Sequence, residues 1–348
     1  MGLPDVPPQP AIIAAIAGWY NQLRMLEGRG DDAAAIKSLF TRDEWQNLSR
    51  VQAWPIVRAA LGTWLSILGA IALWAYYPSV SAFVVAAVVI GSRQHALNNL
   101  VHEAAHYSIS RRKVLNDWIS DALFATPHLI STHAYRQKHA LHHSGLGDAA
   151  IDTERKPRYI IRGAGFLRHT LLALCGMAAY HAAREYAPAA AAVRHPWRYY
   201  VLVPVTNGLL LAYCWWLGRP EAYPLLWLAP LLTVAMYLST LRVIAEHQPE
   251  WYAAHGVEDF SSPFPRFTRS IPAGVLERFF FGPVNFCYHH EHHLAPGIPF
   301  PNLPQLHRLL RERGYFDAND DRIGQTYIGT LARLVFPAGS SGPAEERA

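Results

Sequence analysis

Ser79–His106 reads SVSAFVVAAVVIGSRQHALNNLVHEAAH, an apolar run that ends in two histidines. Its first 22 residues, as far as Leu100, carry a single charge, on Arg93. A helix needs roughly 20 apolar residues to cross the hydrocarbon core of a bilayer. If this helix continues to His106, its 28 residues measure roughly 42 Å at about 1.5 Å per residue. We therefore predict a membrane span that carries two imidazoles beyond the hydrocarbon core.

Three further runs have a similar length and apolar character, although the mean hydropathy of the chain is only +0.04. Proline and glycine separate the runs into pairs, at Tyr77-Pro78 and at Gly218-Arg-Pro-Glu221. We therefore predict an all-α, multi-pass membrane protein with four transmembrane helices in two hairpins. The four predicted spans cover about 55–77, 79–101, 198–218 and 222–243.

Basic residues are distributed unevenly about these spans. Two hairpins place both termini and the long central segment on one side of the membrane. Of the 31 lysines and arginines, only Arg219 falls in a connection on the other side, and the basic side is normally cytoplasmic. We therefore expect a cytoplasmic helical cap that holds every histidine cluster. The net charge of +5 is spread over loops, which favours a membrane surface over nucleic acid as a partner.

Nine histidines gather in three clusters and one singlet. Imidazole is the commonest metal ligand in proteins, and the neutral form that binds metal dominates at pH 7. Residues four apart share one face of a helix, whereas i, i+3, i+4 spacing splays three imidazoles toward two neighbouring ions. The set therefore suits two metal ions about 3.5–4 Å apart. The clusters are His102 and His106, then His139, His142 and His143, then His289, His292 and His293, with His247 as the singlet.

His102-Glu-Ala-Ala-His106 also matches HExxH, the signature of zinc peptidases. Such an enzyme needs three protein ligands and a water, and eight clustered histidines plus His247 exceed that number. Imidazole suits zinc, copper, iron or nickel. Hydrocarbon C–H bonds require an activated oxygen species, which iron can generate, so we favour iron. A non-catalytic metal-binding protein is a third alternative, which only an activity assay excludes.

Longer motifs around these histidines resemble the membrane fatty acid desaturase superfamily, the histidine-box non-haem di-iron desaturases and hydroxylases. Residues Asn285 to Pro304 resemble the third histidine box and its proline-rich tail. Residues His133 to His143 resemble the second box, with Tyr135 where the family often has tryptophan. The HxxxH of the first box is also present, and Arg242 to His247 resemble the segment that supplies an extra ligand.

The chain falls into three predicted regions. Residues 54–313 form the desaturase domain, residues 1–53 an N-terminal cytoplasmic segment with interfacial helices, and residues 314–348 a C-terminal cytoplasmic tail with a disordered end. Thr41-Arg-Asp-Glu44 is a capping box, which predicts a helix leading into the first span. Thr170 to Tyr180 is apolar but too short to span a membrane, so we expect an interfacial or buried segment.

The resemblance implies an O2-dependent, membrane-bound fatty acid (acyl-lipid) desaturase that introduces a double bond into a lipid acyl chain. It implies two iron ions as cofactor, O2 as co-substrate and a separate ferredoxin-like or cytochrome electron donor, since the sequence contains no haem-binding His-Pro-Gly-Gly. A lipid or carotenoid hydroxylase or ketolase of the same superfamily is the alternative, because the motifs do not separate these reactions. The implied iron ligands, which are also the implied catalytic residues, are His102, His106, His139, His142, His143, His247, His289, His292 and His293.

Four polar residues near the ligands are predicted to support them. Glu103, Glu246 and Glu291 each adjoin a predicted ligand. A carboxylate that accepts the far N–H of an imidazole orients the ring and raises its basicity. A solvated or salt-bridged glutamate is the alternative for each of the three. Asn285 is predicted to contact the ligands directly or through a bound water.

Overall fold

The structure is a computed structural model that describes residues 36–146, 152, 163–177, 179–181, 183–184, 194–247, 268–316, 320 and 322–336. These residues form helices and no named strand, apart from one isolated bridge between Ser270 and Ile323, so the predicted all-α class is confirmed. The chain divides into two compact units, Met1–Asn47 and Leu48–Ala348. Most of the predicted N-terminal segment and the end of the predicted tail lie outside the described residues.

The predicted capping box forms at the start of α3 (Arg42–Leu48). The Thr41 backbone N–H and hydroxyl donate to the Glu44 carboxylate at 2.8 and 3.0 Å, and the Glu44 N–H donates to the Thr41 hydroxyl at 3.2 Å. These bonds satisfy amide donors that the first turn of a helix leaves without partners. The predicted helix start is therefore confirmed.

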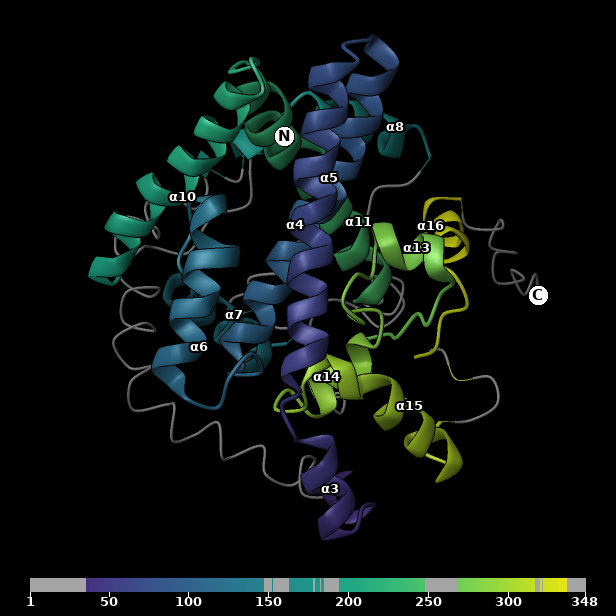
Figure 1. The fold of residues 1–348 in the computed structure, drawn as a ribbon. Helices are drawn as coiled ribbons and strands as arrows, with labels where there is room; N and C mark the ends of the chain where they lie inside the picture. Colours follow the sequence, from purple (N-terminus) through teal and green to yellow (C-terminus); the bar gives the residue numbers. More distant parts are fainter. Residues whose placement is uncertain are drawn as a thin grey trace, which may run out of the picture. The chain divides into compact units, whose positions relative to one another are not determined.

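Two long helices follow, α4 (Ala53–Tyr76) and α5 (Val80–Ala105), and they pack side by side (Figure 1). The break between them falls at Tyr77-Pro78, as predicted. The Ser79 hydroxyl caps α5 by accepting the Ala82 N–H at 3.2 Å. Gly91 lets α5 approach the second pair of long helices, because a Cβ at this position would lie 2.5 Å from the Val234 Cβ.

The second pair of long helices begins with α10 (Trp197–Trp216). Gly218 then turns the chain with a φ of +72°, a conformation that glycine adopts without steric cost. The returning helix runs over Tyr223–Glu246. It contains two π-helical segments before its regular part, namely η5 (Tyr223–Leu228), η6 (Leu231–Ala235) and then α11 (Met236–Glu246).

Three helices among the described residues are long and apolar enough to cross a membrane by length and composition, namely Arg42–Tyr76, Val80–Ala105 and Tyr223–Glu246. They overlap the first, second and fourth predicted spans. The third predicted span forms α10, which is not among these three. Pro204, Thr206 and Asn207 lie within α10 and reduce its apolar character. The crossing of α10 and the cytoplasmic side of the cap therefore stay predictions.

The short apolar stretch that we expected to be interfacial or buried contributes to α8 (Ala164–Leu174). The Thr170 hydroxyl lies 2.6 Å from the Tyr237 hydroxyl of α11, which places α8 beside the third candidate span. Leu167 and Leu171 are 62% and 57% exposed. The outward face of α8 is therefore not buried within the protein.

Shorter helices surround the C-terminal end of α5. The Ser131 hydroxyl caps one of them, α7, by accepting the Ala134 N–H at 3.1 Å. Figure 1 draws α6 and α7 on one side of the long helices and α14 and α15 on the other. Their bounds are α6 Lys113–Ser120, η2 Asp121–Ala125, η3 Thr126–His128, α7 Thr132–Ser144, α13 Val275–Phe280, α14 His289–Leu294, η8 Phe300–Asn302, α15 Leu303–Glu312 and α16 Tyr327–Val335.

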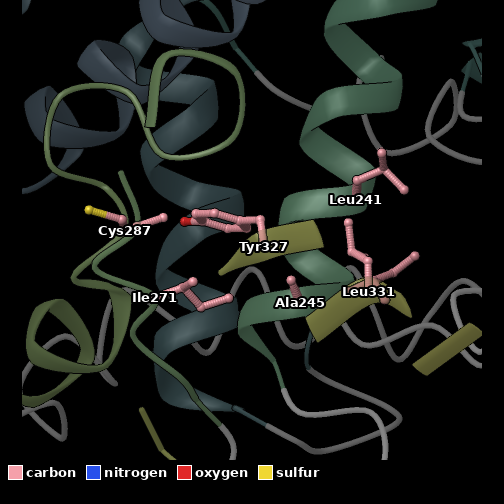
Figure 2. Packing of buried hydrophobic residues seen from close by; sticks show 8 residues of the cluster. Leu241, Ala245, Ile271, Cys287, Tyr327 and Leu331 are labelled. Atoms are coloured by element: carbon pink, nitrogen blue, oxygen red, sulfur yellow. The ribbon is translucent and has the colours of Figure 1, made fainter. Parts of the chain in front are cut away.

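A buried apolar cluster fastens α16 to α11 beside the candidate site. Figure 2 shows Tyr327 of α16 lying between α11 and the segment that carries Cys287. Tyr327 and Cys287 are fully buried. The complete cluster consists of Leu241, Ile244, Ala245, Ile271, Ala273, Cys287, Tyr327 and Leu331. The start of α16 is thus fixed next to the end of α11, where the predicted ligand His247 follows.

Candidate metal centre

The structure brings all nine predicted histidines together in two adjacent groups, each of which could hold a metal ion. Within each group the nitrogens that face one another lie within 4.8 Å. The neighbours His142 and His143 belong to different groups, as the i, i+3, i+4 spacing predicts. The five-histidine group consists of His102, His106, His139, His143 and His292, and the four-histidine group of His142, His247, His289 and His293.

The five-histidine group joins the end of α5 to α7 and α14. The His139 Nε2 lies 2.9 Å from the Nε2 atoms of both His106 and His143. The His292 Nε2 lies 3.2 Å from the His143 Nε2. The His102 ring packs against His139 and His292, with ring centroids 4.3 Å apart in both cases. Three segments that are distant in sequence therefore share one site.

The four-histidine group draws on α7, α14 and the residue after α11. The His289 Nε2 lies 3.0 Å from the Nε2 atoms of both His247 and His293. The His142 Nε2 lies 3.4 Å from the His293 Nε2. His247 was the one predicted ligand outside a cluster, and it lies within this group.

These separations fit coordination better than hydrogen bonding between the rings. A ring nitrogen carries either one proton or one lone pair, so one Nε2 cannot make good hydrogen bonds to two others. Ligands about 2.1 Å from a shared ion lie about 3.0 Å apart at right angles and about 3.4 Å apart in a tetrahedron. The observed Nε2 pairs span 2.9 to 3.4 Å. The residues therefore fit a bound metal in each group.

Burial keeps the imidazoles neutral. Removal from water lowers the pKa of His106 to about 3, with the nearby positive charge of Arg136 as the next cause. Desolvation also holds the pKa values of other ligand histidines well below that of a free imidazole. Repulsion between neighbouring histidines is the next cause. Neutral imidazole is the form that binds metal. The pKa is lowered in this way in five further predicted ligands, His139, His143, His289, His292 and His293.

Arg136 connects α7 to the C-terminal end of α5. Its guanidinium donates to the carbonyl oxygens of Ala104 and Ala105, both at 2.9 Å. The last carbonyls of a helix lack partners within the helix, and the Arg136 guanidinium provides hydrogen-bond donors for two of them. Asp117 holds the same guanidinium at 2.6 Å. His139 follows one turn after Arg136, which places the second histidine cluster beside the first.

Two of the predicted supporting carboxylates face a histidine. The Glu103 Oε1 lies 3.4 Å from the His102 Nδ1, while its Oε2 accepts the Phe300 N–H at 3.0 Å. The Glu246 Oε2 lies 3.6 Å from the His289 Nδ1. Glu246 adjoins His247 in the sequence, but the ring that its carboxylate approaches is supplied by another cluster.

Glu291 is turned toward His307, a histidine outside the three predicted clusters. It accepts a hydrogen bond from the Ser270 hydroxyl and another, at 2.5 Å, from His307 Nδ1. Burial alone would raise the pKa of Glu291, but the hydrogen bond and charge of His307 lower it below its ordinary value. The Glu291–His307 pair therefore ties α14 to α15.

The structure places the Asn285 amide on the turn before α14. The side-chain N–H donates to the Phe300 carbonyl at 3.1 Å, and the side-chain oxygen accepts from Arg278. Val284 and Asn285 have φ values of +53° and +56°, in the left-handed region that asparagine tolerates better than β-branched residues. Contact of Asn285 with the ligands or a water stays a prediction.

Sequence reasoning missed two buried residues that lie beside the four-histidine group. The Asp152 Oδ1 lies 2.7 Å from the His142 Nδ1, and both side chains are buried. The Tyr327 hydroxyl donates to the Glu246 Oε1 at 2.5 Å. Neither residue stands at a ligand-like spacing from a histidine. A buried carboxylate opposite a ligand nitrogen is recognised only once the chain has folded.

The fold and the site together define an all-helical protein with two histidine groups that could each hold a metal ion, near the ends of helices long enough to span a membrane. The sequence also matches the model of the family described as Fatty acid desaturase, over residues 78–324. This match covers well over half of the chain, and the chain belongs to that family. The predicted resemblance is therefore confirmed, and membership indicates an oxidoreductase.

Individual relatives include enzymes named for different reactions. The chain is 27% identical to the dihydrorhizobitoxine desaturase of Bradyrhizobium elkanii over 265 residues, 70% of each chain. It is 25% identical to the sphingolipid delta(4)-desaturase DES1 of Drosophila melanogaster over 249 residues, 67% of this chain and 68% of the relative. It is 29% identical to the beta-carotene ketolase of Paracoccus sp. (strain PC1) over 114 residues, 32% of this chain and 42% of the relative.

Proposed function

We propose that this chain is an O2-dependent, membrane-bound fatty acid (acyl-lipid) desaturase with two iron ions. The observation that carries the proposal is the convergence of nine imidazoles into two adjacent groups in a chain of the Fatty acid desaturase family. His102, His106, His139, His143 and His292 would hold one ion. His142, His247, His289 and His293 would hold the other.

Two bound irons would supply the O2-derived oxidant that removal of hydrogen from an unactivated C–H bond requires. The neutral imidazoles hold such ions without adding negative charge to the site. Asp152 lies within hydrogen-bond distance of the His142 Nδ1 and so fixes the orientation of that ring, while the Glu246 carboxylate lies 3.6 Å behind the His289 Nδ1. The protein thereby fixes the ligand nitrogens before substrate arrives.

Phe286 forms an apolar wall shared by the two groups. Its ring centroid lies 4.5 Å from that of His102 and 5.2 Å from that of His289, so it contacts a ligand of each group. Phe286 is buried. An apolar surface beside the ions excludes water, which protects a strong oxidant and suits a hydrocarbon substrate.

The proposal includes four spans in two hairpins, with the cap, the metal centre and both termini on the cytoplasmic side. The three candidate spans support a membrane location. A lipid acyl chain would enter between the spans and the cap, and a separate ferredoxin-like or cytochrome protein would deliver electrons. No nucleic-acid partner is proposed.

A second candidate keeps the site and changes the product. The local identity of 29% to a beta-carotene ketolase favours hydroxylation or ketolation of a lipid or carotenoid as this alternative. Desaturation and hydroxylation share the first hydrogen abstraction, so the placement of substrate decides between them. The zinc peptidase alternative fits less well, because the HExxH histidines lie among three further imidazoles, more than a catalytic zinc site uses.

Two measurements test the proposal. Metal analysis of protein purified from an iron-replete host should give about two irons per chain, whereas one zinc and no iron would refute it. Total-lipid and carotenoid profiling of an expressing host by mass spectrometry should reveal a product that has lost two hydrogens. A product that has gained oxygen instead would favour the hydroxylase or ketolase alternative. A variant lacking His289 serves as the inactive control.

A further inference from the structure

A buried tyrosine outside the family match reaches the four-histidine group through one carboxylate. The Tyr327 hydroxyl donates to the Glu246 Oε1 at 2.5 Å. The other oxygen of this carboxylate, Oε2, lies 3.6 Å from the His289 Nδ1 and accepts from Arg242 at 3.0 Å. Tyr327 begins α16, just beyond the matched residues 78–324. The C-terminal helix thus supplies a donor to a carboxylate that lies beside the four-histidine group.

The surroundings of Tyr327 hold its hydroxyl in place. The Glu277 carboxylate accepts the backbone N–H groups of Tyr327 and Ile328 at 2.8 and 3.1 Å, which caps the first turn of α16. The Phe281 ring stacks on Tyr327 with centroids 5.2 Å apart and planes inclined by 22°. A Cβ on Gly282 would lie 2.8 Å from the Tyr327 oxygen, so only glycine leaves room for it.

The Glu246 carboxylate depends on such donors. Its side chain is fully buried, and a buried charge without hydrogen bonds is strongly destabilising. Tyr327 and Arg242 each bind a different oxygen, and together they fix the plane of the carboxylate. Loss of the tyrosine hydroxyl would let Glu246 turn toward Arg242, and the oxygen beside His289 would lose its fixed position.

We propose that Tyr327 is a positioning residue for the four-histidine group, acting through Glu246 on His289. The C-terminal helix α16 then contributes to metal binding as well as to the packing of the fold. This inference rests on the proposed function only in treating the four-histidine group as a metal site. It requires no particular substrate, so metal binding alone can test it.

The experiment compares wild type, Tyr327→Phe and the control Tyr237→Phe as full-length, metal-free protein titrated with Co²⁺. The Tyr237 hydroxyl likewise joins α11 to a neighbouring helix, at 2.6 Å from the Thr170 hydroxyl of α8, but Tyr237 precedes His247 by ten residues in the sequence. Wild type and Tyr237→Phe should bind two ions with the same affinities. Tyr327→Phe should bind one ion unchanged and the other roughly 10–100-fold more weakly, the range for loss of a partner behind a ligand. The absorption spectrum of the weakened ion should shift.

Glu246→Gln and the double variant complete the test. If Tyr327 acts through Glu246, the two substitutions should weaken the same ion, and the double variant should lose much less than their summed effects. Additive losses would overturn the proposal, as would a Tyr327→Phe protein with both affinities and the spectrum unchanged. Failure of wild type to bind two ions would instead overturn the proposed function, so the two failures are distinguishable.

Discussion

The five-histidine group and the four-histidine group lie side by side, yet the protein supports their rings differently. In the four-histidine group, Asp152 lies 2.7 Å from the His142 Nδ1 and Glu246 lies 3.6 Å from the His289 Nδ1. All four rings of this group are buried. The hydrogen bond to Asp152 fixes the His142 ring from outside, and the Glu246 carboxylate lies behind the His289 ring.

The five-histidine group has fewer such contacts and one more ring. The Glu103 carboxylate lies 3.4 Å from the His102 Nδ1. Among the described residues, the Nδ1 atoms of His102, His139 and His292 have no hydrogen-bond partner, and neither does that of His289 in the four-histidine group. Two rings of the five-histidine group are only partly buried. We infer that the five-histidine group depends on the number of its ligands, and the four-histidine group on the carboxylates behind them.

Removal of one ligand from each group should give the largest loss of activity. The metal that each variant retains should show which group depends more on a single ligand. His289→Ala leaves three imidazoles in its group, whereas His139→Ala leaves four. We expect product formation to fall in both by more than the roughly 100-fold that loss of a supporting partner costs. Metal analysis should find about one ion per chain in His289→Ala and a second, weakly held ion in His139→Ala.

His290→Gln is the matched control for these substitutions. His290 lies within α14 among the ligands, but its ring nitrogens contact Thr268 and Tyr315, at 2.9 and 3.2 Å. Its metal content should equal that of wild type. The comparison between the groups would be wrong if His139→Ala lost more metal than His289→Ala.

Asp152→Asn tests the carboxylate support of the four-histidine group. The amide retains an oxygen but carries no charge, so the His142 ring loses basicity and a strong acceptor. We expect one of the two ions to bind roughly 10–100-fold more weakly, with the other unchanged, in a Co²⁺ titration of metal-free protein.

Glu291→Gln provides the contrast. Glu291 is buried among the histidines of α14 but is bonded to His307 and Ser270, so the substitution should lower thermal stability without weakening either ion. Equal metal loss in Asp152→Asn and Glu291→Gln would mean that packing around α14, and no specific carboxylate, governs affinity.

The long helices were predictable because their signals are local. The apolar run before His102 and the break at Tyr77-Pro78 follow from hydropathy and from the chemistry of proline. The span at 198–218 shows the limit, since α10 forms there without meeting the same apolar standard. Its polar residues bond to groups that are distant in the sequence. For example, the Asn207 side chain donates to the Thr126 carbonyl at 3.1 Å.

The histidines were predictable and their supports largely were not. Ligands at i, i+3 and i+4 share one face of a helix, whereas the positions between them point elsewhere. Glu291 lies at such an in-between position, which explains why it binds His307 and neither metal group. Asp152 and Tyr327 reach the site through long-range folding, and no spacing rule connects them to His142 or His289.

Arg136 supports the five-histidine group from the backbone side, and its substitution should have a smaller effect. Lysine cannot donate to both carbonyls and to Asp117 in the planar arrangement of a guanidinium. Arg136→Lys should therefore cost roughly 1–3 kcal/mol of stability, the range for a buried polar group left unpaired. Thermal unfolding should detect this loss, with metal affinity changed less than in Asp152→Asn. Arg112→Lys, at an exposed position, should leave both quantities unchanged.

Glu103→Gln should have the smallest effect, and it separates this site from a zinc peptidase. The Glu103 Oε2 accepts the Phe300 N–H at 3.0 Å, and Oε1 lies 3.4 Å from the His102 Nδ1. A glutamine oxygen can replace one of these contacts, and the four other imidazoles still hold the ion. We expect two metal ions per chain and product formation reduced by less than roughly 10-fold, below the roughly 10–100-fold range for loss of a supporting carboxylate. In a peptidase the same glutamate is the general base, so complete loss of activity with full metal content would contradict the proposed role of the five-histidine group.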